Sequence, residues 1–337
     1  MHPLLGSADL TPHFERTLRL CKVRPGETVL IFTDALFPHY AYPGAALAAA
    51  SALGAQVYIL MAQSDQDVED KVIKAAWTHA DMILGMSFLP GSHSWMYADV
   101  HSQALAAGAR VLMVQEPPTT LKRLPPTEEI RRRSLAGAQL MEQAREVRIT
   151  SQAGTDLTMR KDGRKGAYQC GVADEPGRWD HWPTGMVYCA PLENSAEGVL
   201  VVQPGDVLLT SLQPARAEVR LTFRYGKVQS VAGGPEARQI EALLNAAGDD
   251  DAFRLAHAGW GTDPRADWRY VGMDSESLLG AITVALGRNI FSSPAPYCGL
   301  GGVNRSRLHF DMCLLGTSMY LDGRLVVDEG RLAVEGL

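Results

Sequence analysis

The sequence predicts an N-terminal α/β domain built on a parallel sheet, followed by a β-rich α+β domain built on antiparallel strands. Three observations lead to this fold class. The chain has 337 residues, which is long for one small core and favours two domains. Apolar strand-like runs alternate with helix-like stretches as far as residue 114. Short alternating runs bounded by turn residues dominate after residue 146. We therefore expect one domain over residues 1–145 and another over residues 146–337.

In the N-terminal half, apolar runs are expected to form strands, and the stretches between them helices. The first strand is entered through the Pro25-Gly26 turn, and Gly54 ends the alanine-rich helix that follows it. Such alternation indicates βαβ units, and therefore a parallel sheet with helices on both faces. Nucleotide binding is weakly supported, because no Gly-x-Gly-x-x-Gly or Walker-type loop follows any of these strands. The expected strands are residues 27–34, 56–61, 81–86 and 110–114, and the expected helices are residues 44–53, 68–78 and 96–107.

A charged helix flanked by proline pairs is expected to connect the two halves. It covers residues 127–145 and should lead away from the first domain. The second half is expected to be mainly antiparallel sheet, with a turn at Asp322-Gly323 before its last strand. Its expected helices are residues 236–245 and 275–286. Its expected strands are residues 147–149, 156–159, 199–203, 206–210, 217–223, 227–231, 307–315, 319–321 and 324–327.

Composition and charge restrict the class of partner. The formal net charge is −6 and no basic stripe is present, which argues against nucleic acid or an anionic membrane as the main partner. The five cysteines are widely spaced and include no Cys-x-x-Cys pair, so neither a disulfide framework nor a zinc knuckle is expected. The first ten residues lack a basic start and a long apolar region, and no run of 18 apolar residues occurs. We expect a cytoplasmic protein that is neither secreted nor membrane-spanning.

His309 and Asp311 are the first candidates for chemistry. They are two residues apart in an extended apolar run, and residues i and i+2 of a strand share a face. An imidazole and a carboxylate on one face can bind a common metal ion, although a site that does chemistry usually has a third protein ligand. The alternative is a buried pair that only hydrogen-bonds.

Two other histidines stand in contexts that suggest a site. His257 follows apolar residues that run into an expected glycine-rich turn over residues 259–261, where the backbone can approach another group closely. His181 is preceded by Asp180 and flanked by tryptophans, which favours the wall of an amphipathic pocket over a solvated loop.

Four segments of the second domain resemble the aminopeptidase T type of metallopeptidases in their order and approximate spacing. The resemblance covers most of the second domain and, more loosely, the alternating first domain. Individually these motifs are weak, but four in register are fairly specific. The segments are Gly185-Met186-Val187-Tyr188-Cys189-Ala190-Pro191, Ala256-His257-Ala258-Gly259-Trp260-Gly261-Thr262-Asp263-Pro264, Gly280-Ala281-Ile282-Thr283-Val284-Ala285-Leu286-Gly287 and Leu308-His309-Phe310-Asp311.

The departures from the peptidase pattern matter more than the matches. Where those peptidases have two metal-binding glutamates and a histidine, this chain has Met186, His257 and Thr283. The final His-x-Asp is kept as His309 and Asp311. Two histidines and one carboxylate are the ligand set of mononuclear non-haem Fe(II) oxygenases.

One branch of this superfamily, the 2,5-dihydroxypyridine 5,6-dioxygenases, is similar to this chain in that ligand set. The resemblance implies that His257, His309 and Asp311 bind Fe(II), and that 2,5-dihydroxypyridine, or a close hydroxylated aromatic, is opened with O2, in the case of 2,5-dihydroxypyridine to N-formylmaleamate. It also implies a homo-oligomer, for which the proline-flanked segment 117–145 is a plausible contact.

Further roles are expected around the metal. His181 and His93 are the candidates for a base that takes the proton of the ring hydroxyl, because the ordinary pKa of histidine suits that task. Ser293 and Tyr97 are expected to contact the substrate; for Ser293 the alternative is a capping hydroxyl in a tight loop.

Two other functions remain open. A metallo-aminopeptidase-like hydrolase would need ligands that Met186 and Thr283 do not supply. A decayed relative that only binds metal or assembles is the other possibility. Random decay does not account for the exchange of a glutamate for another competent ligand at His257.

Overall fold

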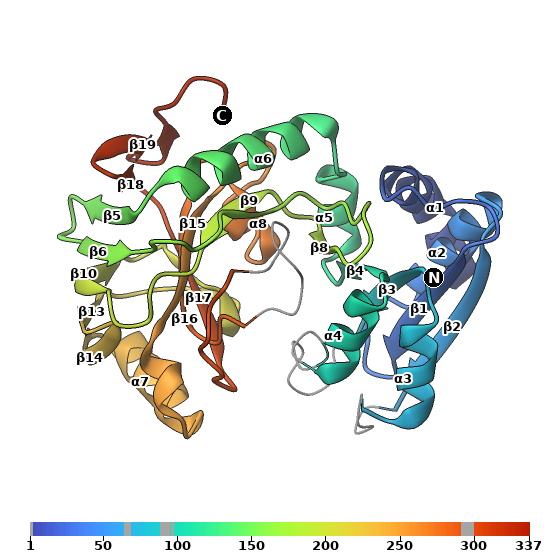
Figure 1. Ribbon diagram of the computed structural model, residues 1–337, viewed down its shortest axis with the longest axis horizontal. Helices are drawn as coiled ribbons and strands as arrows, with labels where there is room; N and C mark the ends of the chain where they lie inside the picture. The colour runs from blue at the N-terminus through green and yellow to red at the C-terminus, as the bar shows by residue number, and fades with distance from the viewer. Residues whose placement is uncertain (1–2, 64–68, 88–94, 96–97, 291–299) are drawn as a thin grey trace. The chain divides into compact units, whose positions relative to one another are not determined.

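Figure 1 shows the computed structural model of the protein, which describes residues 3–63, 69–87, 95, 98–290 and 300–337. By its internal contacts the chain divides into two compact units. The first comprises the chain up to Arg131 together with Gln169–Thr184, and the second comprises Arg132–Tyr168, Gly185–Ile290 and the chain from residue 300. The first contains a parallel sheet and the second contains antiparallel sheets, which confirms the predicted fold class. None of the helices in the described residues has the length and apolar character needed to cross a bilayer.

The sheet of the first unit has five parallel strands in the order β2-β1-β3-β4-β8. The four predicted strands form its first four members. The fifth, β8, comes from beyond residue 145 and pairs with β4, with Val111 opposite Trp179. The strands are β1 (Thr28–Asp34), β2 (Gln56–Ala62), β3 (Met82–Met86), β4 (Arg110–Val114) and β8 (Trp179–Trp182).

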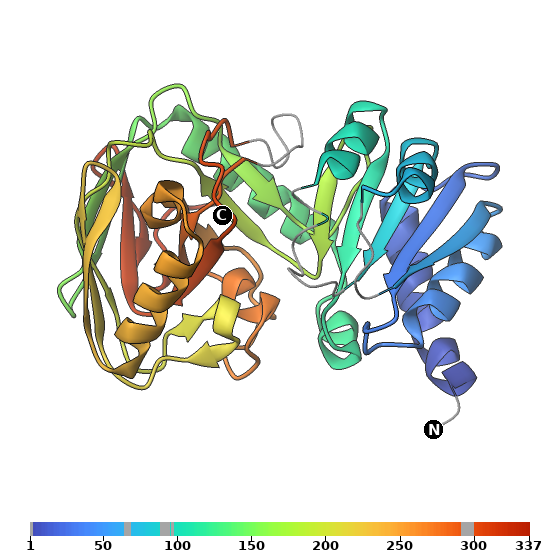
Figure 2. The same cartoon turned by 90° about the horizontal axis from the view of Figure 1, so that it is seen from below.

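Helices flank this sheet on both sides, as Figure 2 shows. On one side, Trp77 of α3 and Val100 of α4 belong to one buried cluster with Phe32 and other strand residues. On the other side α1 packs against α2, where the rings of Phe14 and Tyr42 are 5.7 Å apart. The sequence analysis missed α1 and α5. The helices are α1 (Pro3–Leu20), α2 (Tyr42–Ala52), α3 (Lys71–Thr78), α4 (Asp99–Ala106) and α5 (Pro118–Arg123).

The second unit contains an eight-stranded sheet in the order β14-β13-β10-β6-β5-β18-β19-β20. Seven predicted runs coincide with strands of this sheet, and in three of them, Glu146–Ser151, Asp156–Arg160 and Val219–Arg224, buried residues alternate with more exposed ones. The strands are β5 (Glu146–Ser151), β6 (Asp156–Arg160), β10 (Glu197–Val202), β13 (Val219–Arg224), β14 (Lys227–Gly233), β18 (Thr317–Leu321), β19 (Arg324–Asp328) and β20 (Arg331–Leu332).

A seven-stranded sheet in the order β12-β11-β17-β16-β15-β9-β7 completes the second unit. Helix α6 (Glu128–Gln143), predicted from its charged pattern, packs on it at Gly137, where a side chain would collide with Val187 and Trp260. The strands are β7 (Ala167–Gln169), β9 (Met186–Cys189), β11 (Val207–Leu208), β12 (Gln213–Pro214), β15 (Leu255–Gly261), β16 (Ile282–Gly287) and β17 (His309–Leu314), and the remaining α-helices are α7 (Pro235–Ala246) and α8 (Met273–Ser277).

The predicted helix over residues 275–286 is wrong. Only Met273–Ser277 is helical, and Ile282–Gly287 is the strand β16. All six residues of β16 are buried, because it lies between β15 and β17 in the middle of the sheet. A strand buried on both faces has no polar alternation, so its apolar run resembles a buried helix.

The glycine-rich stretch after His257 is a strand and not a turn. Gly259 lies within β15, opposite Tyr188 of β9. A Cβ atom at this position would collide with the carbonyl oxygen of Val187. The predicted close approach of the backbone at this glycine is therefore real, and it occurs between two paired strands.

The division by contacts differs from the predicted boundary at residue 145. Helix α6 lies mostly in the second unit, and the segment Gln169–Thr184 returns to the first because β8 extends its sheet. We retain residues 1–145 and 146–337 as a proposal for the folding domains.

Candidate metal centre

Three neighbouring strands of the seven-stranded sheet position the candidate metal ligands. β15 carries His257, β17 carries His309 and Asp311, and β16 lies between them. Ala285 of β16 is opposite His257 on one side and opposite Asp311 on the other. Residues directly opposite one another project from the same face of a sheet. The small side chain of Ala285 therefore leaves room above the middle strand, and the longer side chains on either side meet there.

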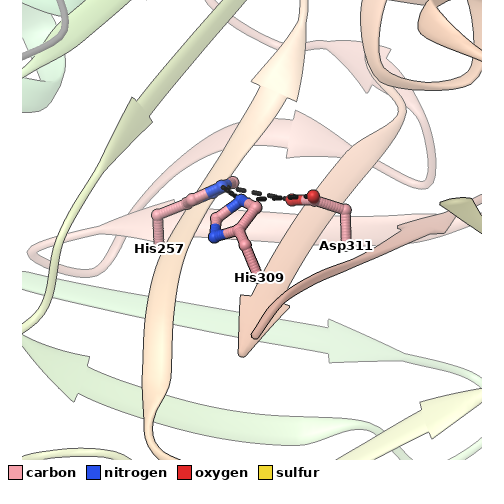
Figure 3. Close-up of side chains that lie close together, drawn as sticks. All are labelled: His257, His309 and Asp311. Carbon is pink, nitrogen blue, oxygen red and sulfur yellow. Dashed lines mark hydrogen bonds and ion pairs between the residues drawn. The ribbon is translucent and has the colours of Figure 1, made fainter. Parts of the chain in front are cut away.

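The three side chains point toward one another, as Figure 3 shows. His257 Nε2 lies 3.3 Å from His309 Nε2 and 3.2 Å from Asp311 Oδ1. His309 Nε2 lies 3.2 Å from Asp311 Oδ2. Nitrogen and oxygen ligands at about 2.1 Å from one ion, with angles of roughly 90–110° between them, are about 3.0–3.4 Å apart. The observed separations therefore fit a single first-row metal ion bound by all three residues.

The orientation of His309 is fixed by a backbone carbonyl. Its Nδ1 lies 2.8 Å from the carbonyl oxygen of Arg288. Because a carbonyl oxygen only accepts, Nδ1 carries the proton and donates it to this bond. In the neutral ring the lone pair is then on Nε2, which faces His257 and Asp311. This is the tautomer that a metal ligand requires.

Burial and the contacts among the three side chains shift their pKa values in opposite directions. Burial lowers the pKa of His257, and the attraction of Asp311 does not offset this. Burial also tends to lower the pKa of His309, but Asp311 and the Arg288 carbonyl outweigh it, so this pKa is raised. Burial tends to raise the pKa of Asp311, yet the two imidazoles outweigh it, so the pKa of this carboxyl lies well below its ordinary value. The site therefore contains an ionised, buried carboxylate, which a bound cation would neutralise.

No other group of three His, Cys, Asp or Glu side chains in the described part of the chain is close enough to share an ion. Met186 and Thr283 lie in the same sheet, on β9 and β16. Thr283 Oγ1 donates to Cys313 Sγ at 3.7 Å, within the buried core. Neither residue belongs to the group of candidate ligands found among the described residues.

Comparison with known proteins places the chain in a family. The family model described as 2,5-dihydroxypyridine 5,6-dioxygenase matches residues 9–334. A 2,5-dihydroxypyridine 5,6-dioxygenase of Pseudomonas putida strain KT2440 is 31% identical over 347 aligned residues, covering 97% of this chain and 96% of that protein. The chain belongs to the 2,5-dihydroxypyridine 5,6-dioxygenase family.

Solved structures agree with this membership. The structure of the dihydroxypyridine dioxygenase from P. putida KT2440 superposes with a TM-score of 0.87 at 29% identity, over 98% of this chain and 99% of that one. Wild-type AmpT from Thermus thermophilus superposes with a TM-score of 0.64 at 15% identity, over 96% of this chain and 100% of that one, and so shares the fold. The predicted resemblance to the dioxygenase family is confirmed, and the likeness to the aminopeptidase is one of fold.

The structure brings together three of the seven residues singled out from the sequence, His257, His309 and Asp311. His181 lies in β8 of the first unit, buried, with its backbone N–H donating to Asp180 Oδ1 at 2.8 Å. Its role as a base stays a prediction. The other three, His93, Tyr97 and Ser293, lie outside the described residues, and their roles stay predictions too.

The sequence did not reveal two residues that shape this site, Arg288 and Ala285. Arg288 acts through its carbonyl oxygen, and any residue type has one, so no sequence signal was available. Ala285 was hidden by the incorrect helix over residues 275–286. With β16 assigned as a strand, the alternation of Thr283, Ala285 and Gly287 would have shown a face of small residues beside the ligands.

Proposed function

We propose that the protein is an Fe(II)-dependent ring-cleaving dioxygenase that converts 2,5-dihydroxypyridine, or a close hydroxylated aromatic, with O2 to N-formylmaleamate. The observation that carries the proposal is the convergence of two histidines and one carboxylate on one point, in a member of this dioxygenase family. Both atoms of O2 enter the product in this reaction, so no external reductant is needed. Such a reaction belongs to nicotinate or picolinate breakdown, and we place it in the cytoplasm.

The donor set supports iron over zinc as the resident metal. Two imidazoles and one carboxylate on one side of the ion are the facial arrangement of non-haem Fe(II) oxygenases. Zinc hydrolysis with the same ligands would also need a nearby glutamate base, which the sequence does not offer beside them. The metallopeptidase-like reading is further weakened because Met186 and Thr283 replace the second set of ligands.

The chain's own residues prepare the site for this chemistry. The Arg288 carbonyl holds the Nδ1 proton of His309, so Nε2 stays available as a ligand. His257 and Asp311 are only 4% and 8% exposed, which limits access of bulk water. When bound by these three residues, Fe(II) would supply the centre at which the ring oxyanion and O2 react. His181 or His93 would accept the proton released by the ring hydroxyl.

The test measures both reactants and the fate of oxygen. The protein is purified anaerobically, supplied with Fe(II), and followed for O2 uptake together with loss of 2,5-dihydroxypyridine absorbance. We expect one O2 consumed per ring lost, and two labelled oxygen atoms in the product when 18O2 is used. Intact iron binding without O2 uptake would contradict the proposal for this substrate. Peptidase activity after loading with zinc would favour the hydrolase.

A further inference from the structure

The strand that carries His257 is irregular directly beside this residue. The register between β15 and β16 shifts between Leu255 and His257, so that Ala256 is an extra residue in β15. Bulges of this kind redirect the side chains next to them and often occur beside active sites. Asn289 Nδ2 donates a hydrogen bond of 3.2 Å to the carbonyl oxygen of Ala256. The amide of Asn289 therefore holds the peptide that joins Ala256 to His257.

The same asparagine contributes to the support of the second histidine. The peptide between Arg288 and Asn289 presents its carbonyl oxygen to His309 Nδ1 at 2.8 Å. The N–H of this peptide donates to the carbonyl oxygen of Asn304 at 3.3 Å. Because the peptide is planar, fixing its N–H also fixes the direction of its C=O. Asn289 thus connects the backbone beside His257 with the acceptor that orients His309.

Asn304 completes the arrangement around Asn289. Its N–H donates to Asn289 Oδ1 at 2.8 Å, and its Nδ2 donates to the carbonyl oxygens of Gly287 at 3.1 Å and Leu255 at 3.4 Å. Asn289 is fully buried and Asn304 is 1% exposed. Buried amides with this many bonds are rigid, and the loss of one donor leaves its acceptor without a partner.

Close packing restricts the Asn289 amide further. Gly302 lies against it, and a Cβ atom at position 302 would collide with Asn289 Cγ, Oδ1 and Nδ2. The amide group therefore has little freedom to turn, and its Nδ2 stays directed at Ala256.

We propose that Asn289, held by Asn304, is a positioning residue for both histidines of the metal centre. It holds the bulge that directs His257, and it holds the peptide that fixes the tautomer and orientation of His309. The inference rests on the proposed metal site. Removal of groups that orient metal-bound histidines typically weakens metal binding about 10-fold to 100-fold. We expect a loss in this range when the Asn289 amide is removed.

Three variants test the proposal in the full-length protein. Asn289→Ala removes the amide, and Asn289→Asp keeps its size and the acceptor for Asn304 N–H but removes the donor to Ala256. Thr155→Val is the matched control, because Thr155 is buried and its Oγ1 exchanges hydrogen bonds with the backbone of Val201 in the eight-stranded sheet. Anaerobic titration with Co(II) gives the dissociation constant, and the visible absorption of bound Co(II) reports its ligand geometry.

The expected result is weaker Co(II) binding by about 10-fold or more in both Asn289 variants, with an altered absorption spectrum, while Thr155→Val binds as the wild type does. Binding within twofold of wild type with an unchanged spectrum in Asn289→Asp would overturn the inference. If Asn289→Ala does not fold, Asn289→Asp decides the question. Failure of the wild-type protein to bind Co(II) or Fe(II) would instead contradict the proposed function.

Discussion

Ala285 lies between His257 and Asp311 on the middle strand, and its methyl group is the only side chain opposite both of them. Two ligands on strands that are not adjacent can approach to 3.2 Å because the residue between them is small. The site therefore depends on the small side chain at this position of β16 as well as on the candidate ligands that β15 and β17 provide.

Ala285→Val is expected to weaken metal binding strongly. The two added methyl groups would occupy the space in which His257 and Asp311 meet, and overpacking a buried site costs about 1–3 kcal/mol. Ala258→Val is the matched control, since Ala258 is equally buried but follows His257 in β15 and faces the other side of the sheet. We expect Fe(II) affinity to fall at least about 10-fold in Ala285→Val and to be kept in Ala258→Val. Equal affinity in both variants would count against the account of this site.

Asp206 is expected to make stability depend on pH. Burial raises the pKa of this carboxyl to about 6, and the N–H groups of Gln203 and Leu315 that donate to it offset burial only in part. Because the folded pKa is above that of the unfolded chain, this contribution is fully present below about pH 4 and declines as pH rises through about 6. Between pH 5 and pH 7.5 we expect wild type to lose about 1 kcal/mol relative to Asp206→Asn. Urea unfolding at the two pH values measures this, and a difference independent of pH would refute it.

At the residue scale, the sequence pointed to the candidate ligands because their side chains would bind the metal. His309 and Asp311 were found from their spacing, and His257 from its place in the peptidase-like pattern. The structure brings all three together. Arg288 and Asn289 could not be found, because one acts through a backbone carbonyl and the other through a hydrogen bond to a bulge that only the strand register reveals.

Among the elements, β8 is attached to the first unit by a buried charge network. Arg178, immediately before β8, donates to Asp174 Oδ1 at 3.2 Å and to Asp180 Oδ2 at 2.9 Å, and all three side chains are fully buried. Asp174 also contacts Lys22 and Arg131. These contacts connect a segment distant in sequence to the sheet and support the strand that carries His181.

Arg178→Ala is expected to destabilise the protein by about 3–5 kcal/mol, because it leaves the carboxylate of Asp180 buried without its cation. The comparison variant is Arg148→Ala, which removes an exposed ion pair with Asp156 and should lower the free energy of unfolding much less. Free energies of unfolding in urea measure both changes. Similar losses in the two variants would show that the buried network does not stabilise β8.

Burial on both faces did not prevent the prediction of β1, β3 and β4, which alternate with helices along the chain, but it hid β16 and β8. The strands β5, β6 and β13 alternate and were found, whereas β16 was taken for a helix and β8 for a pocket wall. All four residues of β8 are buried, so Trp179 to Trp182 show no alternation. Which sheet such a strand joins depends on distant partners such as Val111, and no local pattern encodes that pairing.

At the scale of the whole molecule, the fold and the set of candidate metal ligands give different information about the reaction. The fold is shared with AmpT at 15% identity, so the fold alone does not determine the reaction. We propose that the group His257, His309 and Asp311 distinguishes this chain, together with Met186 and Thr283 at positions where the peptidase pattern is expected to have ligands. The central claim is therefore that one iron ion at this group is required for ring cleavage.

Titration of metal-free protein with Fe(II) tests this claim most directly. After removal of metal with a chelator under anaerobic conditions, increasing Fe(II) is added, and the O2-dependent loss of 2,5-dihydroxypyridine is measured for wild type and His257→Ala. We expect no activity without iron, activity that rises to a limit at one iron per chain, and neither stoichiometric iron nor activity in His257→Ala. Full activity of the metal-free protein, or stoichiometric iron and activity in His257→Ala, would contradict it.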